Sequence, residues 1–66
     1  MIVTKRELDE IDKMILRLSA EGKAIKEIAA HLHLSIPTIK YRRSVMKKEF
    51  RCSNIANLVY TTRELY

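Results

Sequence analysis

Apolar residues recur along most of this chain at intervals of three or four positions, the spacing that gives an α-helix one buried face. Four such stripes are separated by short polar breaks, and the chain contains only one Gly and one Pro, so few residues interrupt helices. The pattern predicts an all-α fold of four helices, at about residues 10–20, 24–32, 36–50 and 55–64.

The first predicted helix has a recognisable start and end. Asp9 is a suitable N-cap, and Asp12, three residues later, stands in a near-capping-box position, where acids also suit the positive helix end. Gly22 can take the left-handed conformation that ends helices. The expected core residues of this helix are Ile11, Ile15, Leu16 and Leu18.

The next two stripes are separated only by the turn 33–35. Ser35 can cap the helix that follows, and Pro37 in the first turn costs no hydrogen bond. The two stripes are Ile25, Ile28, Ala29 and Leu32, then Ile39, Met46 and Phe50. The other faces of the second of these helices carry Lys40, Tyr41, Ser44, Lys47 and Lys48. This helix is therefore expected to have one core face and one basic face.

The last predicted helix follows a break at residues 51–53, with Asn54 as its cap. Its core stripe is Ile55, Leu58 and Val59. Its remaining small or partly apolar positions, which could pair with a second copy of the chain, are Ala56, Asn57, Tyr60 and Thr61.

Length and charge narrow the class of protein. A chain of 66 residues is one domain, residues 1–66, near the lower size limit for a core without disulfides or metal. Residues 1–7 precede the first stripe and are expected to be flexible. The net charge is +5, acids crowd the start, and six of the thirteen Lys and Arg residues lie between Lys40 and Arg51, which favours a polyanionic partner.

A helix of about two turns, a short turn and a second helix with a basic outer face is the arrangement that inserts the second helix into the DNA major groove. This arrangement predicts binding of duplex DNA. Two alternatives stay open: a solvated basic face without a partner, and a helical module that docks on another protein, for example RNA polymerase.

From Leu8 to Leu58 the chain resembles the LuxR-type (GerE-type) DNA-binding domains of bacterial transcription regulators and response regulators. The resemblance is carried by the segments 15–18, 20–23, 26–29 with Leu32, Ser35 with 38–40, and Asn54 with 58–59. It implies base contacts by Lys40, Tyr41 and Ser44, phosphate contacts by Thr38 and Lys47, and a dimer contact through the fourth helix. Arg43 and Lys48, on the same basic helix, are also assigned to phosphates.

Three positions depart from the family pattern. Ala24 stands where a Ser, Thr or Asn cap is usual, Arg42 replaces a common His, and Arg51 replaces a usual Gly. Arg51 is therefore expected to adopt a positive φ, which non-Gly residues rarely take. Arg42 with Lys47 and Lys48 is also similar to the promoter-reading helix of sigma factors, which is a further alternative. The Asn54 cap and the fourth helix favour the LuxR-type interpretation.

The remaining chemistry predicts a non-enzyme without a cofactor or metal. His31 and His33 diverge at a helix end, and no acid or Cys cluster completes a ligand set. Cys52 is alone, so it forms no internal disulfide and is expected to be a small buried hydrophobe. The absence of a nucleophile and base arrangement predicts a non-enzyme, and the absence of a signal or membrane-spanning segment predicts a cytoplasmic protein. Together with the family resemblance, these expectations describe a transcription regulator that binds duplex DNA as a homodimer.

Overall fold

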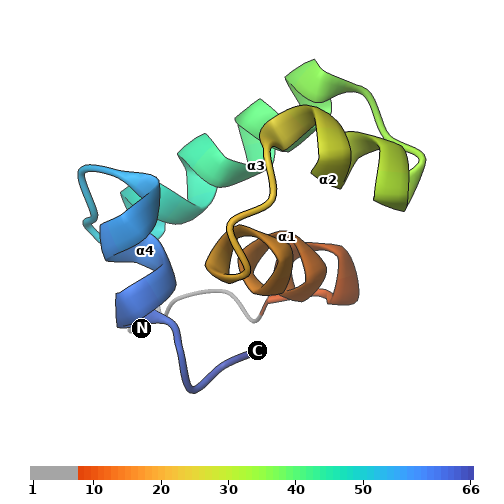
Figure 1. Ribbon diagram of the computed structural model, residues 1–66. Helices are drawn as coiled ribbons and strands as arrows, with labels where there is room; N and C mark the ends of the chain where they lie inside the picture. Colours follow the sequence, from red (N-terminus) through yellow and green to blue (C-terminus); the bar gives the residue numbers. More distant parts are fainter. Residues whose placement is uncertain (1–7) are drawn as a thin grey trace.

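The computed structural model describes residues 8–66, which form four α-helices joined by short turns (Figure 1). These are α1 (Glu10–Ala20), α2 (Ile25–Leu32), α3 (Ile36–Glu49) and α4 (Ile55–Thr61). The predicted all-α, four-helix fold is confirmed, with ends that differ by one residue for α2 and α3. For α4 the difference is larger, because the chain turns from residue 62 onward instead of continuing the helix to 64. The expectation for residues 1–7 lies outside the described residues.

Three helices start on the side-chain caps that the sequence predicts. In each, a side-chain oxygen accepts a hydrogen bond from the backbone N–H three residues later, which satisfies one of the free donors of the first turn. The pairs are Asp9 with Asp12 (2.8 Å), Ser35 with Thr38 (3.2 Å) and Asn54 with Asn57 (2.7 Å). At α2 the Ala24 side chain has no acceptor, and instead the Glu27 carboxylate accepts from the Ala24 N–H at 2.8 Å.

The C-terminal ends of α1, α2 and α3 share one device. Each is followed by a residue with positive φ: Gly22 (85°), His33 (58°) and Arg51 (56°). The N–H of the next residue then returns to the carbonyl five residues earlier, at 3.1, 2.9 and 2.8 Å respectively. This is the pattern of a Schellman motif, which satisfies helix-end carbonyls. The positive φ expected at Arg51 is confirmed, whereas His33 was expected only as part of a turn.

The core forms where α1 meets the other three helices (Figure 1). The buried apolar residues are Leu8, Ile15, Leu16, Leu18, Ile28, Ala29, Ile39, Met46 and Leu58. Residues of the predicted stripes that are only half-buried are Ile11, Ile25, Leu32, Phe50, Ile55 and Val59. Cys52, expected to be buried, is also half-buried, because it lies in the turn between α3 and α4, where its thiol approaches the Phe50 carbonyl at 3.4 Å.

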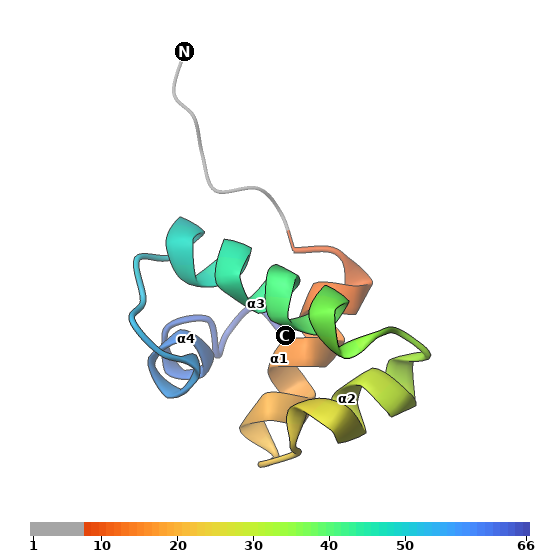
Figure 2. The same cartoon turned by 90° about the horizontal axis from the view of Figure 1, so that it is seen from above.

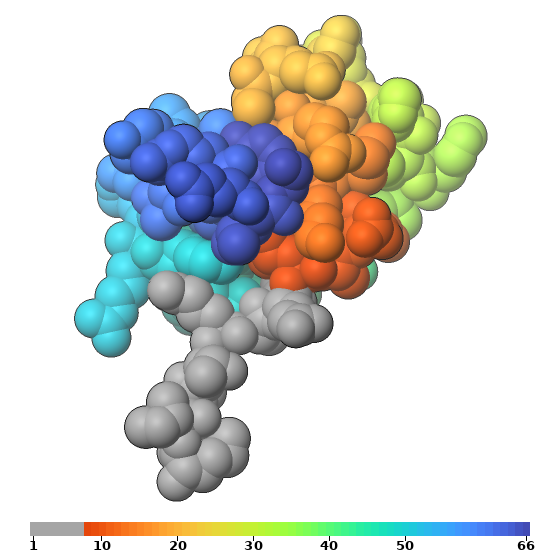
Figure 3. Space-filling view, turned by 90° about the horizontal axis from the view of Figure 1, so that it is seen from below, coloured from red at the N-terminus to blue at the C-terminus, as the bar shows by residue number. Residues whose placement is uncertain are grey.

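Two polar residues belong to the interior. The Thr62 side chain is buried just after α4, and its hydroxyl donates to the Leu58 carbonyl at 2.7 Å. Asp12, on α1, is fully buried as well. Near the chain end, the Tyr66 hydroxyl donates to the Val59 carbonyl at 3.2 Å, so the C-terminal turn folds back on α4. Figure 3 shows α4 with this turn lying beside α1 on one face of the molecule.

The placement of α3 follows from this packing. Seen from above, α2 lies toward the beginning of α3 and α4 toward its end (Figure 2). α1 contacts α3 as well. α3 is thus supported by three helices, and six of its fourteen residues are exposed in the described part of the chain.

Candidate nucleic-acid interface

The outer face of α3 is the exposed arc opposite its two buried residues, Ile39 and Met46. At about 100° per residue, the exposed positions fall within one arc of about 140°. These positions are Ile36, Pro37, Lys40, Tyr41, Ser44 and Lys48. All three side chains that the sequence assigns to base contacts lie in this arc, and Tyr41 leaves 70% of its surface exposed.

The start of α3 is fixed by a small hydroxyl cluster. The Ser35 and Thr38 hydroxyl oxygens are 2.8 Å apart, and the Thr38 N–H donates to Ser35. Thr38 is half-buried, and its hydroxyl belongs to the cap at the N-terminus of α3. The first backbone N–H groups of a helix have no partner within the helix. Such a helix start favours an anion nearby.

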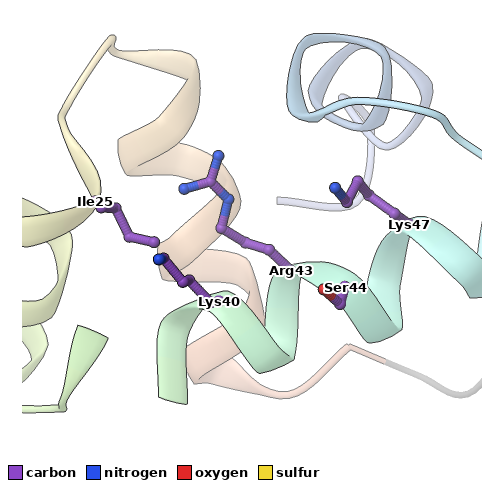
Figure 4. Close-up of a pocket in the computed structure, with 5 residues that line it drawn as sticks. All are labelled: Ile25, Lys40, Arg43, Ser44 and Lys47. Atoms are coloured by element: carbon purple, nitrogen blue, oxygen red, sulfur yellow. The ribbon is translucent and has the colours of Figure 1, made fainter. Parts of the chain in front are cut away.

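An open groove of about 290 Å³ runs between the start of α2 and one side of α3. It is lined by Ile25, the first residue of α2, and by Lys40, Arg43, Ser44 and Lys47. Figure 4 shows the side chains of Lys40, Arg43 and Lys47 pointing to the same side of α3. Their spacing of three, four and seven residues places them on one side of a helix.

The groove has a positive charge. None of the ion pairs found among residues 8–66 uses Lys40, Arg43 or Lys47. Arg43 is half-buried, and this burial lowers the pKa of its guanidinium because the charged form is partly removed from water. Three neighbouring cations, with no acid among the described residues that line the groove, suit a ligand with repeated negative charge.

Arg42 lies on another side of α3 and connects the helix to the start of α1. Its guanidinium donates to both Asp9 carboxylate oxygens, at 2.9 and 3.2 Å, and to Asp12 at 3.2 Å. The hydrogen bond to Asp9 is the main cause that raises the pKa of Arg42, so the group stays charged. Asp9 therefore caps α1 and binds α3 with the same carboxylate.

Sequence reasoning missed this connection. It identified Asp9 and Asp12 as helix-start residues and Arg42 as a departure from the family pattern, without pairing them. The available signal was an arginine on the inner side of a basic helix together with acids elsewhere in a very small domain. Because Arg42 is bonded to α1, the similarity to sigma factors that rested partly on Arg42 has less support.

The predicted dimer residues share one exposed side of α4. Ala56, Asn57, Tyr60 and Thr61 are all exposed, while Leu58 between them faces the core. The Thr61 hydroxyl donates to the Asn57 side-chain oxygen at 3.3 Å. Beside them, the Arg63 guanidinium stacks over the Tyr60 ring at 4.0 Å from its centre. The side chains are thus ordered by neighbours on α4 and in the turn after it.

The structure offers little support for a metal site at the histidines or for a membrane-spanning segment. His31 and His33 are both exposed. Within residues 8–66, no three side chains of His, Cys, Asp or Glu come together in a group that could hold a metal ion. No helix in the same part of the chain has the length and apolar character needed to cross a membrane.

The geometry defines a class of protein first. Two helices joined by the turn 33–35, with the second presenting an exposed basic face, form a helix-turn-helix domain. The chain matches the sequence model of one family, described as bacterial regulatory proteins, luxR family, over residues 1–62. It belongs to this family, whose domains bind DNA in transcription regulation. No curated protein matches the chain.

Proposed function

We propose that this domain binds duplex DNA sequence-specifically, with α3 in the major groove, and thereby regulates transcription. The observation that carries the proposal is the outer face of α3: an exposed arc beside a groove lined by three cations. An α-helix fits the major groove, where each base pair presents its own pattern of donors and acceptors. The flanking cations can bind the phosphates on either side.

Residue roles follow from position on this face. We assign Lys40, Tyr41 and Ser44 to base edges, because they are exposed within the arc. Arg43 and Lys47 line the groove at its edge and Lys48 lies at the exposed side of the helix, which suits phosphate contacts. Thr38 is assigned to a phosphate near the start of α3, where the free N–H groups of the helix also point.

We further propose that two copies bind together through α4. The exposed side with Ala56, Asn57, Tyr60 and Thr61 is small, so its burial supports only weak association in solution. DNA would hold two copies side by side and thereby supply the additional binding free energy that the small α4 interface lacks. Bound sites should then be inverted repeats, and Tyr60→Glu should abolish cooperative occupancy while single half-sites remain bound.

The cellular role proposed for the domain is that of a cytoplasmic regulator without catalytic activity. It would act as the output domain of a response regulator or as a small regulator in its own right, with RNA polymerase as a further partner. The match to the regulatory family supports this setting.

Selection of bound sites from random duplexes, followed by a salt titration, tests the function. A specific DNA reader should enrich a defined motif, and its affinity should fall steeply with salt because phosphate contacts release counterions. No enrichment, with little salt dependence, would instead favour the protein-interaction module. Enrichment of asymmetric sites, each occupied by one copy, would support DNA binding but contradict the proposed dimer. That result would favour the alternative of a sigma-factor-like domain.

A further inference from the structure

The first half of α3 exposes apolar side chains on the face proposed to meet DNA. Ile36, the first residue of the helix, leaves 38% of its surface exposed, and Tyr41 leaves 70%. Pro37 is exposed between them. Of the four large exposed hydrophobic residues among 8–66, two lie on this one face, and the other two are Tyr60 and Leu65.

Core packing does not explain Ile36, which belongs neither to the core cluster found within residues 8–66 nor to the half-buried residues packed against it. The start of α3 is already capped by Ser35, whose oxygen bonds the Thr38 N–H and hydroxyl. A polar residue would serve equally well at the first position of a helix that is open to water, and acids are preferred there. The partly exposed isoleucine at this point is therefore accessible to an apolar group of a partner.

The helix geometry arranges these side chains around a cation. Ile36 and Tyr41 are about 140° apart around the axis and about 7.5 Å apart along it, which is near two base-pair steps of about 3.4 Å. Lys40 lies between them in the exposed arc. In helix-turn-helix proteins the N-terminal residues of the second helix contact base edges, and Ile36 and Tyr41 both lie in this part of α3.

One base offers an apolar group on the major-groove edge. Thymine carries a C5-methyl group there, and apolar side chains contact it, while Lys binds the O6 and N7 acceptors of guanine. We infer that Ile36 and Tyr41 read thymine methyl groups on either side of a guanine bound by Lys40. This inference rests on the DNA-binding function proposed above; it adds Ile36 as a specificity-determining residue and gives Tyr41 an apolar mode of base readout.

Single replacement of thymine by deoxyuridine tests the inference, since this change removes only the methyl group. The probe is the duplex selected from random sequence, with each thymine replaced in turn. Wild-type protein should lose roughly fourfold in affinity at one or two positions, the amount expected for one buried methyl group. Ile36→Ala should bind thymine and deoxyuridine equally at one of these positions, and Tyr41→Ala at the other.

Matched variants separate readout from folding. Leu65→Ala removes an exposed apolar side chain outside α3, with an exposure between those of Ile36 and Tyr41, and should keep the wild-type discrimination. Ile36→Val keeps most of the contact with the thymine methyl group and should retain part of the discrimination between thymine and deoxyuridine. The deoxyuridine series on wild-type protein needs no variant, so the test holds even if Ile36→Ala were to unfold.

Three results would overturn the inference. Equal affinity for thymine and deoxyuridine at every position of a specifically bound duplex would remove it while leaving the proposed function in place. Equal weakening of both duplexes by Ile36→Ala, with discrimination kept, would reassign Ile36 to supporting the helix. Absence of any sequence-specific binding would remove the proposed function and the inference together.

Discussion

α1 and α3 differ in the share of their residues that is buried in the core. Four of the eleven residues of α1 are buried, whereas only two of the fourteen residues of α3 are. α1 contacts each of the other three helices. The longest helix of the domain therefore buries a much smaller share of its residues than α1, and six of its residues are exposed within residues 8–66.

A helix with so few buried residues must be held in other ways. α3 has a hydroxyl cap at its start, an ion pair to α1 through Arg42 and a Schellman-type end at Arg51. Each of these features can be removed by one substitution. The comparison with α1 can thus be tested feature by feature, from the core outward.

The largest effect is expected in the core. Ile15→Ala in α1 and Ile39→Ala in α3 should each lower the free energy of unfolding by about 2–5 kcal/mol, because both side chains are fully buried. The exposed Tyr60→Ala should change it by about 0.5 kcal/mol or less. Chemical denaturation followed by circular dichroism measures all three. A much smaller loss for Ile39→Ala than for Ile15→Ala would show that α3 is held mainly by its polar contacts.

The second effect concerns the link between the two helices. Arg42→Ala takes the guanidinium away from the fully buried Asp12 and should cost about 2–4 kcal/mol. In a double-mutant cycle with Asp12→Asn, the two losses should not add. Lys48→Ala, an exposed cation on the same helix, is the control and should leave stability unchanged. Additive losses would mean that the pair does not couple α1 to α3.

Substitutions of cationic residues in α1 and α3 should differ in their effect on DNA binding. Lys40→Ala should weaken specific binding by about 1–3 kcal/mol and non-specific binding less, because a base contact carries sequence information. Lys47→Ala should weaken binding to all sequences and lower the salt slope by about one. Lys13→Ala in α1, where Lys13 pairs with Glu10 at 3.7 Å, should change neither. An effect of Lys13 equal to that of Lys47 would place α1 in the interface.

The smallest effect is expected at the helix ends. Gly22 follows the end of α1 and Arg51 follows the end of α3, and both have positive φ. Arg51→Gly should raise the free energy of unfolding by about 0.5–1 kcal/mol, because the strain of a left-handed side-chain-bearing residue exceeds the entropy cost of Gly. Gly22→Ala should lower it by about 1 kcal/mol through backbone strain alone, since a Cβ there would meet no atom within 4 Å. Thermal unfolding measures whether each substitution raises or lowers stability. A lower stability of Arg51→Gly would contradict the proposed backbone strain at Arg51.

Local rules predicted most of the fold. Asp9, Ser35 and Asn54 cap as expected, because a cap depends on atoms three residues apart. The deeply buried Ile15, Ile28, Ile39 and Leu58 follow from helical spacing. The early end of α4 did not follow, because the chain turns at residues 62–65 and the Tyr66 hydroxyl returns to the Val59 carbonyl, a contact that helical spacing does not indicate.

The site was predicted in part. Exposure of Lys40, Tyr41 and Ser44 follows from their position opposite the apolar stripe of α3. Two features depend on tertiary packing and did not follow: the groove lined by Ile25 of α2, and the bonds of Arg42 to acids 30 and 33 residues away. Spacing rules describe one helix at a time, so they do not identify which side chains of two helices meet.

The bond between Arg42 and Asp12 has a consequence for sequence variation among relatives. A buried carboxylate becomes less favourable when a cation beside it is removed, so loss of Arg42 penalises Asp12, whereas loss of Asp12 leaves Arg42 paired with Asp9. Chains that replace Arg42 with an uncharged residue should therefore replace Asp12 too, whereas Asp9 can persist as the cap of α1. Two positions 30 residues apart would then change together within the family, while a third in the same cluster changes independently.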